Sequence, residues 1–225
     1  MGIAYNTNIV RDGLVLYLDA ANIKSYPGTG TVWNDLSGNG NNGTLVNGVG
    51  YSSNNSGIMS FDGTNDYVDA PNGIYPASGI TISAWVYLNS NARYSYNVMG
   101  SINSPNWFIM PMYPQNGWVY FYLRGDDGTQ RALNTTTCPI NQWVHITETF
   151  NGTQMKIYFN GNEIVSSNQT FNYTQINLQT FKVGQRGDIE SYFSGNISNV
   201  SIYNRALSVN EIQQNFNALR GRYVI

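Results

Sequence analysis

Short strands separated by glycine- and asparagine-rich turns dominate this chain of 225 residues. Residues 80–88 and 143–150 alternate between inward and outward positions, which is typical of β-strands with one buried face. The Asn-Gly dipeptides at 151–152 and 160–161 tolerate positive φ, so residues 143–165 are predicted to form a three-strand meander. Because connections this short join antiparallel neighbours, the pattern favours an antiparallel all-β fold.

One helix is predicted, directly after the last strand. Ser208 and Glu211 have the S-x-x-E spacing of a capping box, in which each side chain binds a free backbone N–H at the helix start. Ile212, Phe216 and Leu219 then recur at helical spacing. We therefore predict an all-β fold, a two-sheet antiparallel jelly-roll sandwich with one short C-terminal helix.

The length and composition indicate a single domain. Residues 12–225 fit one large sandwich, whereas residues 1–11 show no periodicity and are predicted to form an N-terminal arm. Lys plus Arg number 11 against 13 Asp plus Glu, and a net charge of −2 offers no basic surface for nucleic acid. The sequence shows neither a secretion signal nor an apolar run long enough for a membrane span, so we expect no membrane partner.

Six segments occur in the order expected of a laminin G-like domain of the concanavalin A-like superfamily. They are DGLVLYLDA (12–20), WNDLSGNGNNGTL (33–45), FDGTNDYVD (61–69), ITISAWVYL (80–88), QWVHITETFNGTQMKIYFNGNEI (142–164) and GNISNVSIYNRALSVNEI (195–212). On these segments the chain resembles that family. The resemblance implies a concanavalin A-like sandwich whose relatives mostly bind other molecules and sometimes hydrolyse glycans.

The opening segments, including LVLYLDAAN and FDGTNDYV, are also similar to modules of structural proteins of tailed bacteriophages. This resemblance implies a non-enzymatic virion protein, made in the host cytoplasm and placed on the virion surface as a capsid decoration. Its partner would be the major capsid protein or another shell protein, with the arm 1–11 laid on the shell as a strand or clamp. A second copy of the chain is left open as a further partner.

The alternative function is a glycan-binding adhesin module on a tail or fibre. Residues 94–122 interleave aromatic residues with asparagines, which suits sugar rings because C–H faces stack on aromatic planes while hydroxyls bind amides. Trp118, Tyr120 and Tyr122 share one strand face and are expected to pack in the core. The predicted glycan-binding residues are Trp107, Tyr113, Asn106 and Asn116.

Calcium is the one cofactor that the sequence leaves open. Asp35 begins a loop with the spacing of half an EF-hand, but position twelve is Val46, so a turn held by its own side chains is favoured. A resemblance to pentraxins implies a calcium site built from Asn65, Asp66 and Asp188.

Catalysis is not expected. Laminarinase-type hydrolases of the superfamily carry E-x-D-x-x-E on one strand, and this chain has no such run, so a glycoside hydrolase is the weaker alternative. His145 is the only histidine and lies between Val144 and Ile146 on an alternating strand, which favours a structural role. The glutamates are scattered, at Glu148, Glu163, Glu190 and Glu211.

Overall fold

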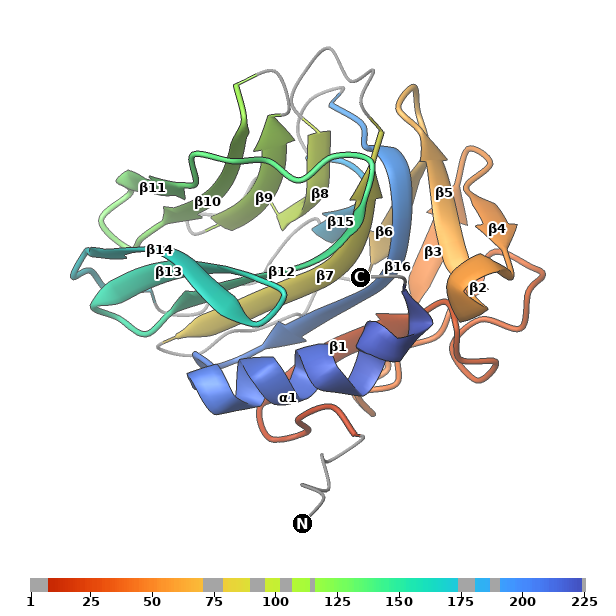
Figure 1. Cartoon of the computed structure of the whole chain (residues 1–225), viewed down its shortest axis with the longest axis horizontal. Coiled ribbons are helices and arrows are strands. Elements are labelled where there is room, and N and C mark those ends of the chain that lie inside the picture. The colour runs from red at the N-terminus through yellow and green to blue at the C-terminus, as the bar shows by residue number, and fades with distance from the viewer. Residues whose placement is uncertain are drawn as a thin grey trace.

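Two antiparallel β-sheets pack face to face, and one short helix lies against the outer side of one sheet (Figure 1). This computed structural model describes residues 8–70, 79–89, 96–101, 107–113, 116–173, 181–186 and 191–223. The architecture confirms the predicted all-β antiparallel sandwich with a C-terminal helix.

The two sheets, named here sheet I and sheet II, have eight strands each. Sheet I contains, in spatial order, β14 (Asn162–Asn168), β13 (Gln154–Phe159), β12 (Trp143–Phe150), β7 (Ile80–Leu88), β16 (Ser194–Tyr203), β5 (Ile58–Asp62) and β4 (Gly50–Ser52), with β1 (Leu14–Asp19) also paired to β16. Sheet II contains β11 (Gln130–Asn134), β10 (Trp118–Arg124), β9 (Trp107–Tyr113), β8 (Tyr96–Ser101), β15 (Phe181–Val183), β6 (Tyr67–Ala70), β3 (Gly43–Val46) and β2 (Val32–Trp33). A short 3-10 turn, η1 (Asn54–Ser56), connects β4 to β5.

Strand β16 connects distant parts of the chain within sheet I. One of its edges pairs with β7, while the other edge pairs first with β5 and then, from Asn199 to Tyr203, with β1. The predicted meander is confirmed on the far side of β7, since β12, β13 and β14 are consecutive neighbours. Asn160 and Gly161 turn the second hairpin with φ values of 51° and 79°, the left-handed region that this dipeptide tolerates.

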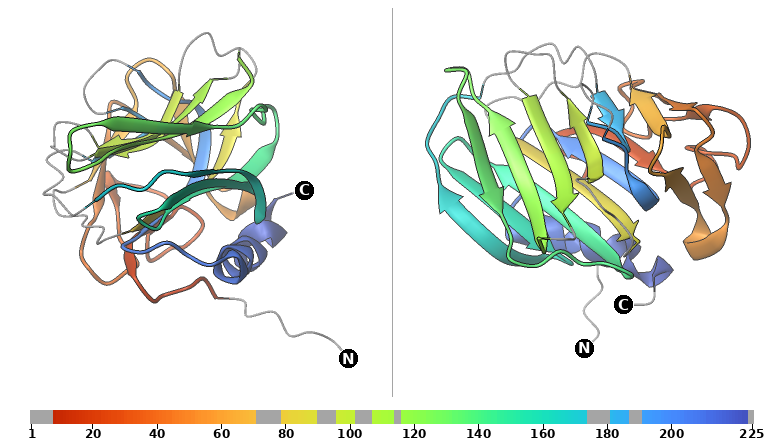
Figure 2. Two further views of the ribbon diagram at one scale, coloured as in Figure 1. Left: turned by 90° about the vertical axis from the view of Figure 1, so that its left-hand side faces the viewer. Right: turned by 90° about the horizontal axis from the view of Figure 1, so that it is seen from above.

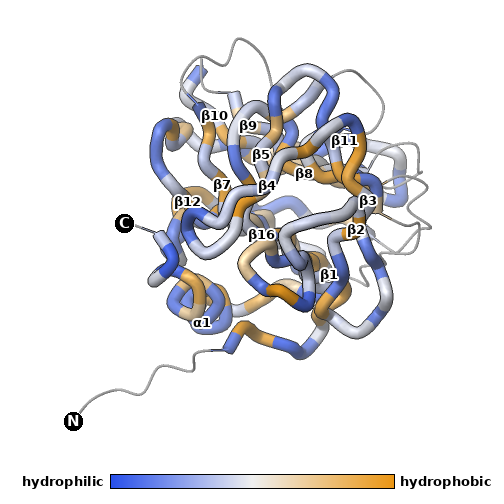
Figure 3. Tube along the Cα trace, turned by 90° about the vertical axis from the view of Figure 1, so that its right-hand side faces the viewer, coloured by the Kyte–Doolittle hydropathy of each residue, from blue (hydrophilic) through white to orange (hydrophobic). Residues whose placement is uncertain are grey.

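Alternate residues of the facing strands fill the space between the sheets. In β10, Val119, Phe121 and Leu123 have no exposed surface and belong to the main hydrophobic cluster. Each fully buried side chain of this kind contributes about 2 kcal/mol through the hydrophobic effect. Figure 3 shows hydrophobic stretches along the strands and mainly hydrophilic ones along the connecting loops.

Glu148 is an exception in this interior. It lies on the inward face of β12, directly opposite Ile82 of β7 and Ile157 of β13, and is 0% exposed. Neither of its carboxyl oxygens has a hydrogen-bond partner among the residues that the structure describes. Burial raises the pKa of Glu148 well above its usual value, because a carboxylate loses its hydration there. The fold therefore favours the protonated, uncharged side chain.

Helix α1 (Val209–Leu219) lies against the outer face of sheet I (Figure 1). The backbone N–H of Glu211 donates to the Ser208 hydroxyl, and the backbone N–H of Ser208 donates to the Glu211 carboxylate, so the predicted capping box is confirmed. Ile212 and Leu219 of the helix are buried in a second hydrophobic cluster with Trp85 of β7. Among the described residues, no helix is long and apolar enough to cross a membrane.

Residues 8–11 also lie against this side of the domain. Ile9 and Val10 are buried in the second hydrophobic cluster. The backbone N–H of Val10 donates to the Asn215 side chain of α1 at 2.8 Å, and the Tyr203 hydroxyl donates to the Val10 carbonyl at 3.1 Å. The arm predicted for residues 1–11 stays a prediction, since residues 1–7 lie outside the described part of the chain.

The end of the chain is attached to the first strand by an ion pair. Arg222, in the 3-10 turn η2 (Arg220–Arg222) after α1, donates two hydrogen bonds to the Asp19 carboxylate, at 2.7 and 3.0 Å. The Tyr17 hydroxyl donates a third at 2.8 Å. The Asp19 side chain is 2% exposed, so loss of these partners would leave a buried carboxyl group unpaired.

Replacing Glu148 by glutamine is expected to change how stability depends on pH. Because the folded-state pKa of Glu148 is raised, the native protein binds this proton more tightly than the unfolded chain does. The free energy of unfolding therefore falls as the pH rises above about 4.5, by up to about 1.4 kcal/mol per pH unit. Glu148→Gln removes this contribution. Urea unfolding across pH 4 to 8 measures it, and a variant whose pH slope equals that of the wild type would contradict the assignment.

Replacing Arg222 by methionine is expected to lower the free energy of unfolding by about 3 kcal/mol, because Asp19 would keep a buried charge without its partner. Denaturant unfolding measures this loss. Arg131→Met is the matched control, since it breaks an ion pair with the largely exposed Asp127 and should cost much less. Equal losses in the two variants would refute the role of the Asp19–Arg222 pair.

Candidate functional site

Four aromatic side chains gather on the outer face of sheet II. Because Val119, Phe121 and Leu123 of β10 point inward, the residues between them point outward. The expectation that these outward residues pack in the core is therefore wrong. Residues 118–123 are all apolar or aromatic, so alternation over this segment alone does not distinguish the inner from the outer face. We name the outward group the aromatic row: Tyr113, Trp118, Tyr120 and Tyr122.

The rings of the aromatic row support one another. Tyr120 is in the middle, with its ring centroid 5.2 Å from that of Tyr113, 5.7 Å from that of Trp118 and 4.9 Å from that of Tyr122. The first two contacts are edge-to-face and the third is stacked, with interplanar angles of 76°, 83° and 9°. Each such pair contributes about 1 kcal/mol beyond surface burial, so the row is held in one arrangement before any ligand arrives.

The side chains of the aromatic row are partly exposed. Burial, with smaller contributions from Tyr113 and Tyr120, raises the pKa of Tyr122 to about 12. Burial and Tyr113 also raise the pKa of Tyr120. The hydroxyls of both therefore stay protonated at neutral pH and both donate and accept hydrogen bonds. The row thus combines apolar ring surface with uncharged hydroxyls.

The structure places two of the four predicted glycan-binding residues here. Tyr113 is a member of the aromatic row, and Asn116 is exposed in the turn that joins β9 to β10, where its backbone N–H donates to the Tyr113 carbonyl at 3.1 Å. Trp107 is the first residue of β9, and its backbone pairs with Arg124 of β10. The Trp107 side chain lies outside the described part of the structure. Asn106 lies outside the described residues as well. Sequence reasoning missed Trp118, Tyr120 and Tyr122 as surface residues.

The predicted calcium ligands are not assembled among the described residues. Asn65 is exposed, whereas Asp66 is buried and accepts a hydrogen bond from the Asp62 backbone N–H at 3.1 Å. Desolvation raises the pKa of Asp66. Asp188 lies outside the described ranges, and within those ranges no group of three or more His, Cys, Asp or Glu side chains has the arrangement of a metal site. The calcium site stays a prediction.

Asp35 holds its own loop. One carboxylate oxygen accepts from the backbone N–H groups of Tyr17 and Ser37, both at 2.9 Å, and the other accepts from the Asn41 backbone N–H at 3.0 Å. These bonds give the loop the side-chain support expected of a polar turn rather than an EF-hand.

His145 lies within hydrogen-bond distance of a serine, but both are buried beneath α1. The distance from His145 Nε2 to Ser83 Oγ is 2.7 Å, and the His145 ring stacks on Trp85 with a centroid distance of 5.2 Å. Within the described part of the chain, His145 Nδ1 has no hydrogen-bond partner, so no described acid orients the pair as in a catalytic triad. Burial lowers the pKa of His145 to about 3. The pair has the surroundings of a structural contact.

The described glutamates also have structural positions. Glu148 is in the core, Glu163 accepts a hydrogen bond from Lys156 Nζ at 2.8 Å, and Glu211 caps α1 while bonded to Arg205. The fourth, Glu190, lies outside the described residues. The described glutamates therefore do not form the paired acids of a glycoside hydrolase.

Comparison with known proteins places the sequence in a family. Residues 62–213, more than half of the chain, match the laminin G-type family model described as Concanavalin A-like lectin/glucanases superfamily. No curated protein matches the sequence at a significant level.

Several solved structures share the fold. The receptor binding domain of botulinum neurotoxin C/D mosaic serotype is 18% identical with a TM-score of 0.72, over 92% of this chain and 51% of that one. The botulinum neurotoxin serotype D ligand binding domain, in complex with N-acetylneuraminic acid, is 18% identical with a TM-score of 0.70, over 92% and 51%. This chain therefore spans about half the length of the toxin domains it matches.

A third structure matches over nearly its whole length. It is domain 4 of AbnA, a GH43 extracellular arabinanase from Geobacillus stearothermophilus, in complex with arabinotriose. The identity is 18% and the TM-score 0.70, over 90% of this chain and 97% of that one. At these identities the likenesses concern the fold.

His145 is expected to resist chemical modification in the folded protein. As the only histidine, it is the only imidazole that diethyl pyrocarbonate can modify, and the overlying helix and Trp85 shield it. We expect diethyl pyrocarbonate to modify His145 at least about 100-fold more slowly in the folded protein than in urea-unfolded protein. Mass spectrometry of the peptide that contains His145 measures both rates. A folded-state rate close to the unfolded one would show that the Ser83–His145 pair is open to solvent.

Proposed function

The chain belongs to the concanavalin A-like lectin/glucanases superfamily, and on that premise we propose that it is a glycan-binding module without catalytic activity. The single observation that carries the proposal is the aromatic row. Sugar rings offer apolar C–H faces and many hydroxyls, and the row offers ring surface beside uncharged phenol groups.

The position of the aromatic row also favours binding. It lies on strands β9 and β10, inside the edge strand β11 of sheet II, where Tyr113 pairs with Trp118 and Tyr122 pairs with Ile109 of β9 and Ala132 of β11. Figure 2, in its right-hand view, shows these strands of sheet II nearest the viewer, with α1 on the far side of the sandwich. A rigid, partly exposed row on a sheet loses little conformational entropy when a ligand binds.

Two of the structural neighbours give independent support. Domain 4 of AbnA, of which this chain covers 97%, was solved in complex with arabinotriose, and the serotype D toxin domain, of which it covers 51%, was solved in complex with N-acetylneuraminic acid. These likenesses favour the glycan-binding alternative over capsid decoration. The virion-surface location, the contact with a shell protein and the resemblance to bacteriophage proteins stay predictions.

The absence of catalysis is proposed from the described acids. Glycoside hydrolysis requires two carboxyl groups facing one sugar from a cleft, at a separation of about 5 to 10 Å. Glu148 is enclosed between the sheets, and Glu163 and Glu211 are engaged by Lys156 and Arg205. None of these three glutamates belongs to the outer face of sheet II where the aromatic row lies.

Removing one ring from the aromatic row is expected to weaken glycan binding at least about tenfold, which corresponds to about 1.4 kcal/mol of lost ring contact. The variants are Trp118→Ala and Tyr120→Ala. The wild type is first screened on a glycan array that includes arabino-oligosaccharides and sialylated glycans, and the affinity for the strongest binder is then measured by isothermal titration calorimetry.

Tyr51→Ala is the matched control, because Tyr51 is a surface tyrosine of sheet I that packs on Tyr26 at 5.1 Å between ring centroids. It should leave the affinity unchanged. A wild-type protein that binds no glycan on the array, or variants of the aromatic row that bind as well as Tyr51→Ala, would refute the proposal.

A further inference from the structure

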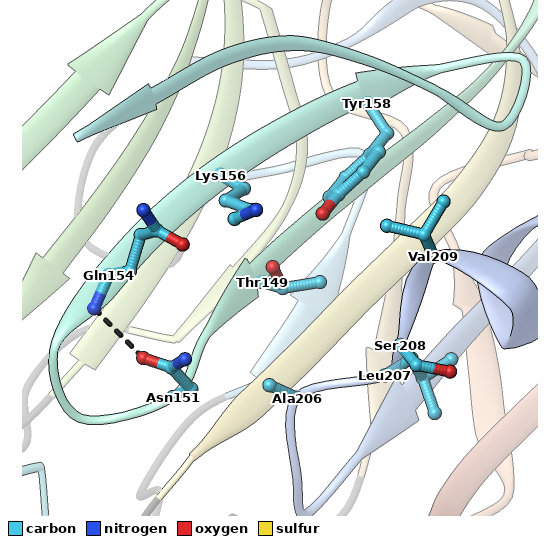
Figure 4. A pocket seen from close by; sticks show the side chains of 9 residues that line it. All are labelled: Thr149, Asn151, Gln154, Lys156, Tyr158, Ala206, Leu207, Ser208 and Val209. Carbon is cyan, nitrogen blue, oxygen red and sulfur yellow. Dashed lines mark hydrogen bonds between the residues drawn. The ribbon is translucent and has the colours of Figure 1, made fainter. Parts of the chain in front are cut away.

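A concave site lies on the side of the sandwich opposite the aromatic row, on the outer face of sheet I. It is a pocket of about 170 Å³ between strands β12 and β13, the turn before α1 and the first turn of that helix (Figure 4). One ordered water needs only about 15 Å³, and pockets for drug-sized ligands measure about 300 Å³ or more. The pocket therefore has the size class of one small ring.

The lining of this pocket is polar on the strand side and apolar on the helix side. Figure 4 shows the Tyr158 hydroxyl directed toward Thr149, with the Asn151 amide at the end of β12 and Val209 across from them. Leu207 and Val209 supply the apolar wall, and Val209 is 42% exposed. Hydroxyl and amide groups facing an aliphatic wall match the two kinds of surface on a sugar ring.

The charges around the pocket are already balanced. Lys156 Nζ donates to the Glu163 carboxylate at 2.8 Å. At the helix start, Glu211 accepts hydrogen bonds from the Ser208 backbone and from Arg205. An anion would be attracted to Lys156 and to the start of α1, but the carboxylates of Glu163 and Glu211 already occupy these positions. The balance favours a neutral ligand over phosphate or sulfate.

From the size, lining and charge balance, we propose that this pocket binds one residue of a neutral sugar, such as a hexose or a pentose. The site is separate from the aromatic row, which lies on the other sheet, so the proposal does not depend on glycan binding there. Val209 would contact the apolar face of the ring, while the hydroxyls of Tyr158 and Thr149 and the Nδ2 group of Asn151 would bind its hydroxyls. The Asn151 Oδ1 atom already accepts hydrogen bonds from Thr153 and Gln154.

Two-dimensional ¹H–¹⁵N NMR tests the pocket directly. D-galactose, D-glucose and L-arabinose are added separately to the full-length protein at about 50 mM, above the millimolar Kd expected of a ligand with about a dozen non-hydrogen atoms. We expect saturable shifts in the amides of residues 206–210 and of Gln154 with at least one of the sugars. Sodium phosphate and sodium sulfate are added in parallel.

Val209→Trp fills the pocket, and we expect it to weaken the affinity for the sugar, measured from these shifts, at least about fivefold. Val32→Trp is its control, because Val32 is a similarly exposed valine, 45% against 42%, on the edge strand β2 of the other sheet. Ala206→Leu fills the pocket from another side and replaces Val209→Trp should that variant fail to fold. Trp118→Ala should leave the shifts intact, which separates this site from the aromatic row.

Several results would overturn the proposal. They are the absence of shifts with all three sugars, equal shifts in Val209→Trp and Val32→Trp, and saturable shifts with phosphate or sulfate in place of the sugars. Loss of the shifts in Trp118→Ala with retention in Val209→Trp would also overturn it, since the sugar would then be bound at the aromatic row.

Discussion

The packing of α1 and the chain end on Trp85 decides which outer face of this sandwich is open. Trp85 stacks on Tyr223 with ring centroids 4.0 Å apart and on Phe216 at 5.6 Å. The Asp19–Arg222 ion pair holds the chain end in the position that this stack requires. A two-sheet sandwich has two outer faces, and this contact covers one with a third layer. Sheet II has no helix of the described chain against it, so its aromatic side chains are available for a ligand.

Each outer face includes residues that hydropathy alone would place on the other. Beneath α1, beside the second hydrophobic cluster, lie Ser83, Thr147 and His145, which are joined by a 2.7 Å contact between His145 and Ser83 and a 3.0 Å contact between Ser83 and Thr147. On the open face the aromatic row is packed ring against ring. Tertiary structure thus buries a polar group that forms its own hydrogen bonds and exposes an aromatic group that ligand binding can use.

Local chemistry made much of the fold predictable from sequence. The Ser208–Glu211 capping box and the Asn160–Gly161 turn each depend on a few adjacent residues, and the structure has both. The inner and outer faces of β10 were hard to predict, because six of its seven residues are apolar or aromatic and only Arg124, at its end, marks the outer face. The facing sheet and the position of α1 decide between them. The contact between Ser83 and His145, 62 positions apart, likewise requires the register of β7 against β12.

The two proposed sites differ in what they can recognise. The aromatic row is an open surface built from four rings on two strands, and its length along β10 suits several consecutive sugar residues. The pocket at Val209 has a volume of about 170 Å³ and suits one sugar residue. Since the sheets of a sandwich are about 10 Å apart and each site faces outward, a short oligosaccharide does not reach both. One module with both sites would bind two separate glycan chains or two distant points of one polysaccharide. When both points belong to one polysaccharide, the second contact benefits from a high effective concentration.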